Sequence, residues 1–227
     1  MSAAGEAAIR DAASLILLRR DAAGASVLMG MRGQSAVFMP SKFVFPGGAV
    51  DPGDAALLLA RPLPEPHRRR LLVEPSGKAA PDAIAAAALR ELAEETGLLI
   101  GRPGSGGPAG FGEAGLVPDA GGLLYLFRAI TPPGRPRRFD AHFFVADAAD
   151  VTGDPEDFSA ACDELSHLHW VRLDEARRLD LPFITEVVLA ELAELAALAA
   201  PGQPLPVPDS VPFFDNRSER PRFVQID

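Results

Sequence analysis

The residue types best suited to chemistry stand close together at positions 90–98, where the sequence reads Arg-Glu-Leu-Ala-Glu-Glu-Thr-Gly-Leu. Glu91, Glu94 and Glu95 are spaced i, i+3 and i+4, so a helix would carry their carboxylates on one face. Three like charges there repel one another, and a divalent cation would neutralise them. Hard oxygen ligands suit Mg²⁺ or Mn²⁺ better than zinc. The spacing therefore allows a metal site, but a solvated acidic helix face is the default interpretation of an isolated ExxEE.

A second segment, Phe45-Pro46-Gly47-Gly48, favours the metal site over a plain acidic surface. Two adjacent glycines allow backbone conformations and a close approach that a Cβ atom would forbid. A carbonyl bared in this way beside the carboxylates can serve as a further metal ligand.

Together the two segments resemble the box of the Nudix hydrolases, G-x5-E-x7-R-E-U-x-E-E-x-G-U, in which U is a bulky apolar residue. Gly48 matches the opening glycine, and Asp54 falls where the first glutamate stands. The second half of the box is matched at every fixed position by Arg90, Glu91, Leu92, Glu94, Glu95, Gly97 and Leu98.

The match has two departures. Asp54 replaces a glutamate, and its shorter side chain is expected to weaken the contact that the glutamate makes. The spacer between Asp54 and Arg90 spans residues 55–89, which is 35 residues where the family has 7, so 28 residues are inserted. We therefore expect a long insertion inside the box, at about residues 55–81.

The resemblance implies an α/β fold, a Nudix α/β/α sandwich with a mixed sheet, and metal-dependent hydrolysis of a diphosphate linkage in a nucleoside diphosphate derivative. Glu94 and Glu95 would hold Mg²⁺ or Mn²⁺, with a carbonyl from the Gly48 region. Glu91 would be either a further ligand or the base that takes a proton from water, and motif position alone does not separate these roles. Arg90 would pair with a glutamate and fix its rotamer.

A remote carboxylate often completes such a site, and Glu164 is the first candidate. Asp163 and Glu156 are alternatives, and a solvated loop is an equally good account of each. Cys162 lacks the histidine and asparagine companions of a cysteine nucleophile, so we expect it to be a small buried residue.

Substrates of the coenzyme A type are slightly favoured. The interrupted box and the Arg-Arg-Phe-Asp-x-x-Phe-Phe stretch that ends at Phe144 resemble the subgroup that acts on CoA and acyl-CoA. An R-x3-G-x3-FPGG pattern of some relatives is absent, since Val37 and Ser41 stand at its arginine and glycine. The insertion carries cations that could meet phosphates or be solvated: Arg61, His67, Arg68, Arg69 and Arg70.

ADP-ribose, NADH and nucleotide sugars remain alternative substrates. A catalytically silent nucleotide sensor is the alternative from another class, and the intact set of Glu91, Glu94 and Glu95 speaks against it. The resemblance makes a homodimer one expected assembly.

Composition sets wider bounds. The chain has 227 residues, 48% of them hydrophobic, which is enough for one domain over residues 1–227. A formal charge of −9 argues against nucleic-acid polymers as partners and leaves a small-molecule diphosphate, bridged by cations, as the expected one. No apolar run approaches the roughly 20 residues of a membrane span. With a single cysteine and no signal peptide in view, we expect a cytoplasmic protein.

The elements that must position these residues follow from hydrophobic periodicity. We expect strands at 14–20, 26–32, 123–131, 138–147 and 167–173, with an extended segment at 37–45. We expect helices at 82–96, 174–179 and 183–199. Pro81 should open the first helix and Gly97 should end it, with Ile84, Ala88, Leu89 and Leu92 as its buried stripe.

Two segments are expected to lack regular structure. The glycine-rich residues 101–122 are interpreted as a flexible loop, and the proline-rich tail 201–227 as an irregular segment that wraps the domain. In the last helix, the residues Leu189, Leu192, Leu195 and Leu198 are expected to form a buried stripe.

Overall fold

The computed structural model of the chain describes residues 7–33 and 39–227. Its main feature is a large mixed sheet of strand order β11-β10-β7-β8-β1-β2-β3, to which β4 adds by pairing with β1 and β9 by pairing with β2. The strands of this sheet are β1 (Ile9–Asp21), β2 (Gly24–Arg32), β3 (Phe43–Val44), β4 (Gly47–Ala49), β7 (Leu124–Ile130), β8 (Arg138–Asp147), β9 (Leu165–Arg172), β10 (Val211–Asp215) and β11 (Arg222–Ile226). The β1–β8 and β7–β10 pairs are parallel.

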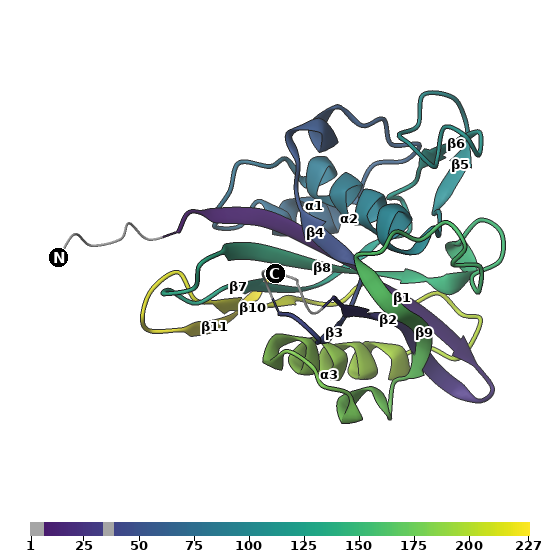
Figure 1. Cartoon of the computed structure of the whole chain (residues 1–227). Coiled ribbons are helices and arrows are strands. Elements are labelled where there is room, and N and C mark those ends of the chain that lie inside the picture. The colour runs from purple at the N-terminus through teal and green to yellow at the C-terminus, as the bar shows by residue number, and fades with distance from the viewer. Residues whose placement is uncertain (1–6, 34–38) are drawn as a thin grey trace.

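Helices cover both faces of this sheet (Figure 1). The helices α1 (Glu65–Leu71) and α2 (Pro81–Thr96) lie on one side, and α3 (Phe183–Ala197) lies on the other. Short 3-10 turns are η1 (Pro52–Ala56), η2 (Ala148–Asp150) and η3 (Ala176–Arg178). The predicted α/β/α sandwich with a mixed sheet is confirmed.

The central strand β1 shows why two apolar layers form. Leu15 and Leu17 belong to the core that includes α2, while Ile16 and Leu18 belong to the core that includes α3. All four side chains are fully buried, because successive residues of a strand point to opposite faces. A strand that is covered on both faces has a continuous run of apolar residues in its sequence, and Leu15–Leu18 is such a run.

Helix α2 has the bounds and the buried face that the sequence predicts. Pro81 lies in its first turn, and Gly97 ends it with φ = 77°, the left-handed conformation that glycine adopts most readily. The predicted stripe from Ile84 to Leu92 is buried against the sheet. The glutamates therefore emerge from the remaining part of the helix surface.

The insertion is more ordered than its sequence suggests. It contains α1, whose His67 side chain is fully buried and accepts a hydrogen bond through Nδ1 from the backbone N–H of Tyr125 at 3.3 Å. The Arg70 guanidinium donates to the carbonyls of Pro208 and Asp209 at 2.8 and 2.6 Å. The insertion thus contacts both the interior strand β7 and the segment that precedes β10.

The prediction of an irregular tail is wrong for two segments. Residues 211–215 and 222–226 form an antiparallel hairpin, β10–β11, and β10 adds to the main sheet beside β7. The apolar residues Val211 and Phe213 are buried, and this burial outweighs the proline content on which the prediction depended.

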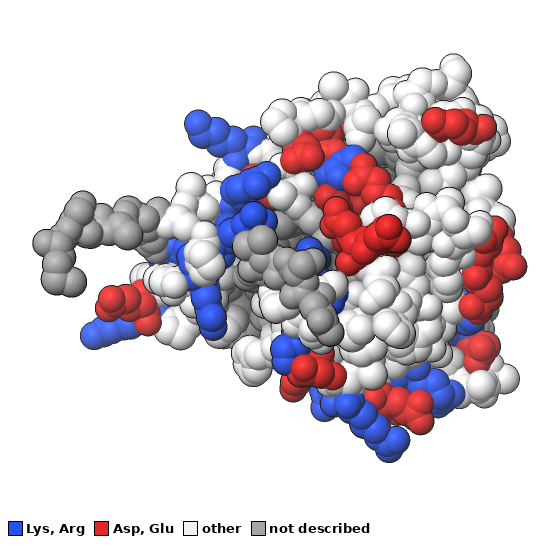
Figure 2. Space-filling view, in the orientation of Figure 1, with Lys and Arg blue, Asp and Glu red and all other residues white. Residues whose placement is uncertain are grey.

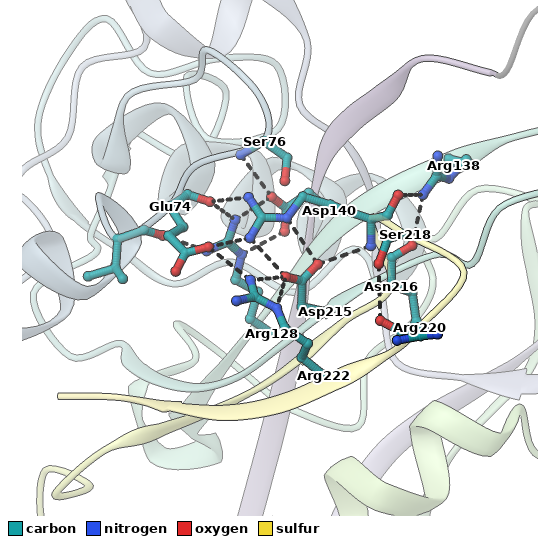
Figure 3. Close-up of polar contacts among 12 residues, drawn as sticks. Glu74, Ser76, Arg128, Arg138, Asp140, Asp215, Asn216, Ser218, Arg220 and Arg222 are labelled. Carbon is teal, nitrogen blue, oxygen red and sulfur yellow. Dashed lines mark hydrogen bonds and ion pairs between the residues drawn. The ribbon is translucent and has the colours of Figure 1, made fainter.

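A network of charged residues joins the tail, the insertion and the sheet (Figure 3). Fully buried Arg128 donates to both carboxylate oxygens of Asp140 at 2.8 and 2.6 Å and to the carbonyls of Val73 and Glu74. In the tail, Asp215 accepts hydrogen bonds from two arginines that also reach the Glu74 carboxylate, namely Arg217 and Arg222. Segments far apart in sequence are tied together by these contacts.

Three further expectations need correction. The glycine-rich stretch 101–122 contains a small antiparallel pair, β5 (Gly101–Pro103) and β6 (Leu116–Pro118), and buries Phe111 beneath it. In the segment 37–45, residues 37 and 38 lie outside the described residues, and a turn in which Met39 and Ser41 have positive φ precedes β3. Leu198 is 71% exposed, because α3 ends at Ala197.

The remaining strands and helices lie close to their predicted positions. β1 and β2 extend the predicted hairpin, β7 and β8 match the next two strands, and β9 begins two residues earlier than expected. The short helix expected at 174–179 is the 3-10 turn η3.

Candidate functional site

The Arg90 guanidinium connects the two halves of the box. Its Nε and Nη2 atoms donate to the two carboxylate oxygens of Asp54 at 2.8 and 3.0 Å. Nη1 donates to Glu91 Oε1 and to Glu94 Oε2, both at 2.9 Å, and Nη2 also donates to the Ala49 carbonyl at 3.1 Å. These hydrogen bonds raise the pKa of Arg90 further above its usual range, the contact with Asp54 contributing most. The insertion therefore does not separate the two halves in space.

The expectation that Asp54 makes a weakened contact is wrong. The residue lies on the 3-10 turn η1 and is buried, and both of its oxygens meet Arg90. One of them also accepts the backbone N–H of Asp51 at 2.7 Å. The turn brings the shorter carboxylate close enough to make a two-pronged ion pair, which is the strong geometry for arginine.

Glu95 is the most deeply buried of the glutamates, at 1% exposure. Its Oε2 atom accepts the backbone N–H of Gly47 at 2.7 Å, whereas its Oε1 atom is buried with no hydrogen-bond partner. Burial raises the pKa of Glu95 to about 8, and the hydrogen bond from Gly47 only partly offsets this. An unpartnered buried carboxylate oxygen is costly, so the geometry indicates that a cation belongs beside it.

Gly48 makes room for Glu91. A Cβ atom built on Gly48 would lie 2.3 Å from Glu91 Oε1, so no other residue type fits without moving the carboxylate. Burial raises the pKa of Glu91, and the adjacent Arg90 opposes the rise. The predicted proximity of the Gly48 backbone to the carboxylate cluster is present in the structure.

Glu94 and Glu164 lie at the surface of the same region. Both are exposed, and the charge of Glu164 raises the pKa of Glu91 and of Glu95, which places it near them. Acidic side chains gather over the end of α2 and the start of β9 in Figure 2. Cys162 lies here too, with its backbone N–H bonded to the Glu94 carbonyl at 3.0 Å, and it is exposed rather than buried as we expected.

Arg32, a residue that sequence reasoning missed, stands at the end of β2 beside this cluster. Its positive charge lowers the pKa of Glu95. The only feature of the sequence that could have indicated Arg32 is its place at the end of a strand, shortly before the glycine pair.

Four of the five cations of the insertion are engaged in contacts within the fold rather than arranged as a phosphate site. Arg61 forms a bidentate ion pair with Asp119, Arg68 pairs with Asp82, and Arg70 holds the tail carbonyls. Of the five, Arg69 alone has an exposed side chain with no polar contact in the described part of the chain.

A second group of potential ligands lies apart from the predicted residues. Asp11, Asp140 and His142 place one ligand atom each within 4.8 Å of one another. Because Arg128 occupies both oxygens of Asp140 and Tyr125 contacts His142 Nδ1 at 2.8 Å, internal contacts already satisfy this group. Asp11 in turn accepts the backbone N–H of Ala79 at 3.0 Å, so all three residues are engaged within the fold.

The box residues fit a divalent cation. They offer hard oxygen ligands, one of them an orphaned buried oxygen of Glu95, and a glycine cradle that a Cβ atom would fill. Glu91, Glu94, Glu95 and the Gly48 carbonyl are the groups that would hold it, and Arg90 would fix two of these carboxylates.

Comparison with known proteins agrees with this geometry. A family model described as the NUDIX domain matches residues 54–192, which is more than half of the chain. A Caenorhabditis elegans protein named "Putative nudix hydrolase 7" is 30% identical over 183 residues, covering 73% of this chain and 52% of that protein. The chain thus spans about half the length of this curated relative.

Solved structures show the same fold. The crystal structure of a NUDIX hydrolase from Alicyclobacillus acidocaldarius matches with a TM-score of 0.62 and 29% sequence identity, covering 87% of this chain and 99% of that one. Within the described residues, no helix has the length and apolar character needed to cross a membrane. The matched domain and the reassembled box together show that this chain belongs to the Nudix hydrolase family.

Proposed function

We propose that this protein hydrolyses a diphosphate linkage in a nucleoside diphosphate derivative, with Mg²⁺ or Mn²⁺ as the cofactor. One observation carries the proposal: the buried Glu95 carboxylate has one oxygen held by Gly47 and the other unpartnered, within a cluster that Arg90 organises. A purely structural carboxylate would have both oxygens satisfied.

The chain's own residues have separate parts in this reaction. A bound divalent cation would supply Lewis-acid polarisation of the phosphate oxygens and would acidify a coordinated water. Arg90 keeps the Glu91 and Glu94 carboxylates in place through its Nη1 atom. Burial holds the pKa of Glu91 above its ordinary value, which suits a group that must accept a proton from water near neutral pH. Glu91 is therefore proposed either as this base or as a ligand.

Glu164 is proposed as the remote carboxylate that completes the site. It is exposed at the start of β9, and its charge acts on both buried glutamates. An exposed carboxylate at the rim can accept a proton from water and return it to solvent.

CoA and acyl-CoA stay among the proposed substrates, but the basis for favouring them is reduced. The insertion cations that could have met the 3′-phosphate of CoA are mostly paired within the fold. In the stretch ending at Phe144, Asp140 and His142 are buried in β8 and serve the core. ADP-ribose, NADH and nucleotide sugars therefore stand as equal candidates.

The test is turnover of a substrate panel with Mg²⁺ or Mn²⁺, followed by mass spectrometry. The panel holds CoA, acetyl-CoA, ADP-ribose, NADH, a nucleotide sugar and a diadenosine polyphosphate. We expect cleavage of at least one diphosphate, abolished by chelation and by Glu95→Gln. If a folded sample cleaves none of them with either metal, yet binds one, the silent nucleotide sensor becomes the better account.

A further inference from the structure

The Arg32 backbone is paired on both sides at the rim of the proposed site. Its backbone N–H donates to the Lys42 carbonyl at 3.0 Å, and its carbonyl accepts the Ser41 N–H at 3.1 Å. On its other side it pairs in register with Leu165 of β9, the residue directly after Glu164. Two neighbouring segments thus fix the backbone from which this side chain extends.

The Arg32 guanidinium lacks the partners that the buried arginines of this protein have. Its Nε atom is buried without a hydrogen bond, and the side chain forms no ion pair with any residue in the ranges 7–33 and 39–227. By contrast, Arg90 and Arg128 each engage a carboxylate with two nitrogens. A half-buried cation without an anion is unfavourable unless a ligand supplies one.

The unpartnered groups at this site have opposite signs. Glu95 presents a buried Oε1 atom with no partner, and Arg32 presents a buried Nε atom with none. Their charges interact, but they form no ion pair with each other in the described structure. A metal-bound phosphate has the chemistry to satisfy both, since its cation suits the carboxylate and its oxygens suit a guanidinium.

We infer that Arg32 binds phosphate oxygens of the substrate's diphosphate and so orients it against the carboxylate cluster. This inference rests on the proposed function and adds to it a residue that contacts the substrate. An arginine at this place presents a planar fork of donors to the non-bridging oxygens, which a lysine cannot reproduce. The group recognised is the diphosphate itself, not the base or the acyl chain.

The test is binding of methylenediphosphonate, a diphosphate analogue that cannot be hydrolysed, measured by calorimetry with Mg²⁺ in excess over protein and probe. We expect Arg32→Ala to weaken probe binding by about tenfold to a hundredfold, the range for hydrogen bonds to charged groups. Arg32→Lys should fall in between. Arg178→Ala, which removes the same charge from a side chain that is 81% exposed, should bind like wild type.

A second readout separates ligand binding from structure. Affinity for Mn²⁺ alone, measured by electron paramagnetic resonance, should be unchanged or tighter in Arg32→Ala because a nearby positive charge is lost. Unweakened probe binding by a folded Arg32→Ala, or equal loss of Mn²⁺ and probe, would overturn the inference. If Arg32→Ala does not fold, the same comparison is made with Arg32→Gln. The protein could bind the probe through Arg32 and yet turn over no substrate of the panel. That result would reject the proposed hydrolysis but would keep the inference that Arg32 binds a diphosphate.

Discussion

The Arg90 guanidinium makes the contacts on which both halves of the box depend. It holds Asp54 with two nitrogens and the Glu91 and Glu94 carboxylates with the third. The side chains of Arg90 and Asp54 are 15% and 1% exposed, so water screens the pair weakly. Removal of Asp54 would leave part of the guanidinium free to turn away from the glutamates.

We therefore expect Asp54→Ala to lower metal affinity by about tenfold to a hundredfold, as loss of a group that orients metal ligands does. Asp54→Glu restores the residue that the family box carries and should stay close to wild type. Mn²⁺ titration of both variants checks this, and an unaltered affinity in Asp54→Ala would show that Arg90 does not depend on it.

The buried Glu95 carboxyl makes a pH prediction. Its pKa is about 8 in the folded protein against an ordinary value of 4.5, so across that interval the unfolded chain binds fewer protons. Without metal, stability should fall as pH rises from about 5 to 8 and then level off. Bound Mg²⁺ favours the charged carboxylate, so it should raise the melting temperature more at pH 8 than at pH 6.

Glu95→Gln provides the comparison for the same measurement. The amide oxygen can still accept the Gly47 N–H, so the fold should persist with a flatter dependence of melting temperature on pH. Turnover should fall by orders of magnitude. A metal-free wild type that melts at a higher temperature at pH 8 than at pH 6 would contradict the assignment of this titration to Glu95.

At the scale of elements, β4 and α2 must approach closely for the site to form. Gly48 permits the approach because a Cβ atom there would strike the Glu91 carboxylate. We expect Gly48→Ala to fold and to lose about a hundredfold in turnover, the scale on which a displacement of about 1 Å affects catalysis. Gly53→Ala is the matched control, since nothing lies within 4 Å of a Cβ atom built there. Equal rates in the two variants would mean that the fit at Gly48 is irrelevant.

Elements differ in how far the sequence alone could predict them. The helix α2 has its limits marked by Pro81 and Gly97 and its face marked by apolar spacing, so both were predictable. The strands β10 and β11 were not, because the value of Val211 and Phe213 as core residues depends on a neighbour, β7, that lies far away in sequence. For the same reason the box motif indicated Glu91 and Glu95, but no local pattern indicated that Arg32 would lie beside them.

At the scale of the whole molecule, the insertion, the tail and the sheet meet at Arg128 and Asp140, which are both fully buried. We propose on this basis that residues 1–227 form a single domain.

Asp140→Asn should lower the free energy of unfolding by about 3–5 kcal/mol, because it leaves a buried cation uncompensated. Urea denaturation measures this. Asp174→Asn, which breaks an exposed pair that water screens, should have a much smaller effect. If the two substitutions lower the free energy of unfolding equally, the buried pair stabilises the protein no more than the exposed pair does.

Deletion of residues 58–80 tests whether the insertion is a spacer or part of the fold. It would remove the carbonyl partners of Arg128 and the His67 acceptor for Tyr125 N–H, so we expect a marked fall in melting temperature. Metal binding should survive in the fraction that folds, since the hydrogen-bond partners of the Arg90 side chain, Ala49, Asp54, Glu91 and Glu94, all lie outside this range. An undiminished melting temperature would show that the sheet is stable without these contacts.

Asp11 of β1 contacts the chain both before and after the segment that contains the insertion. Its carbonyl accepts the Val50 N–H and its carboxylate accepts the Ala79 N–H. The chain therefore departs from and returns to one place on β1, so residues can be added within the intervening segment without moving its two ends. Closing a longer segment costs only about 0.6 kcal/mol for each doubling of its length. We therefore expect this junction to accept a grafted reporter domain. Searches that require a fixed distance between the two half-motifs would overlook a chain with an insertion at this place.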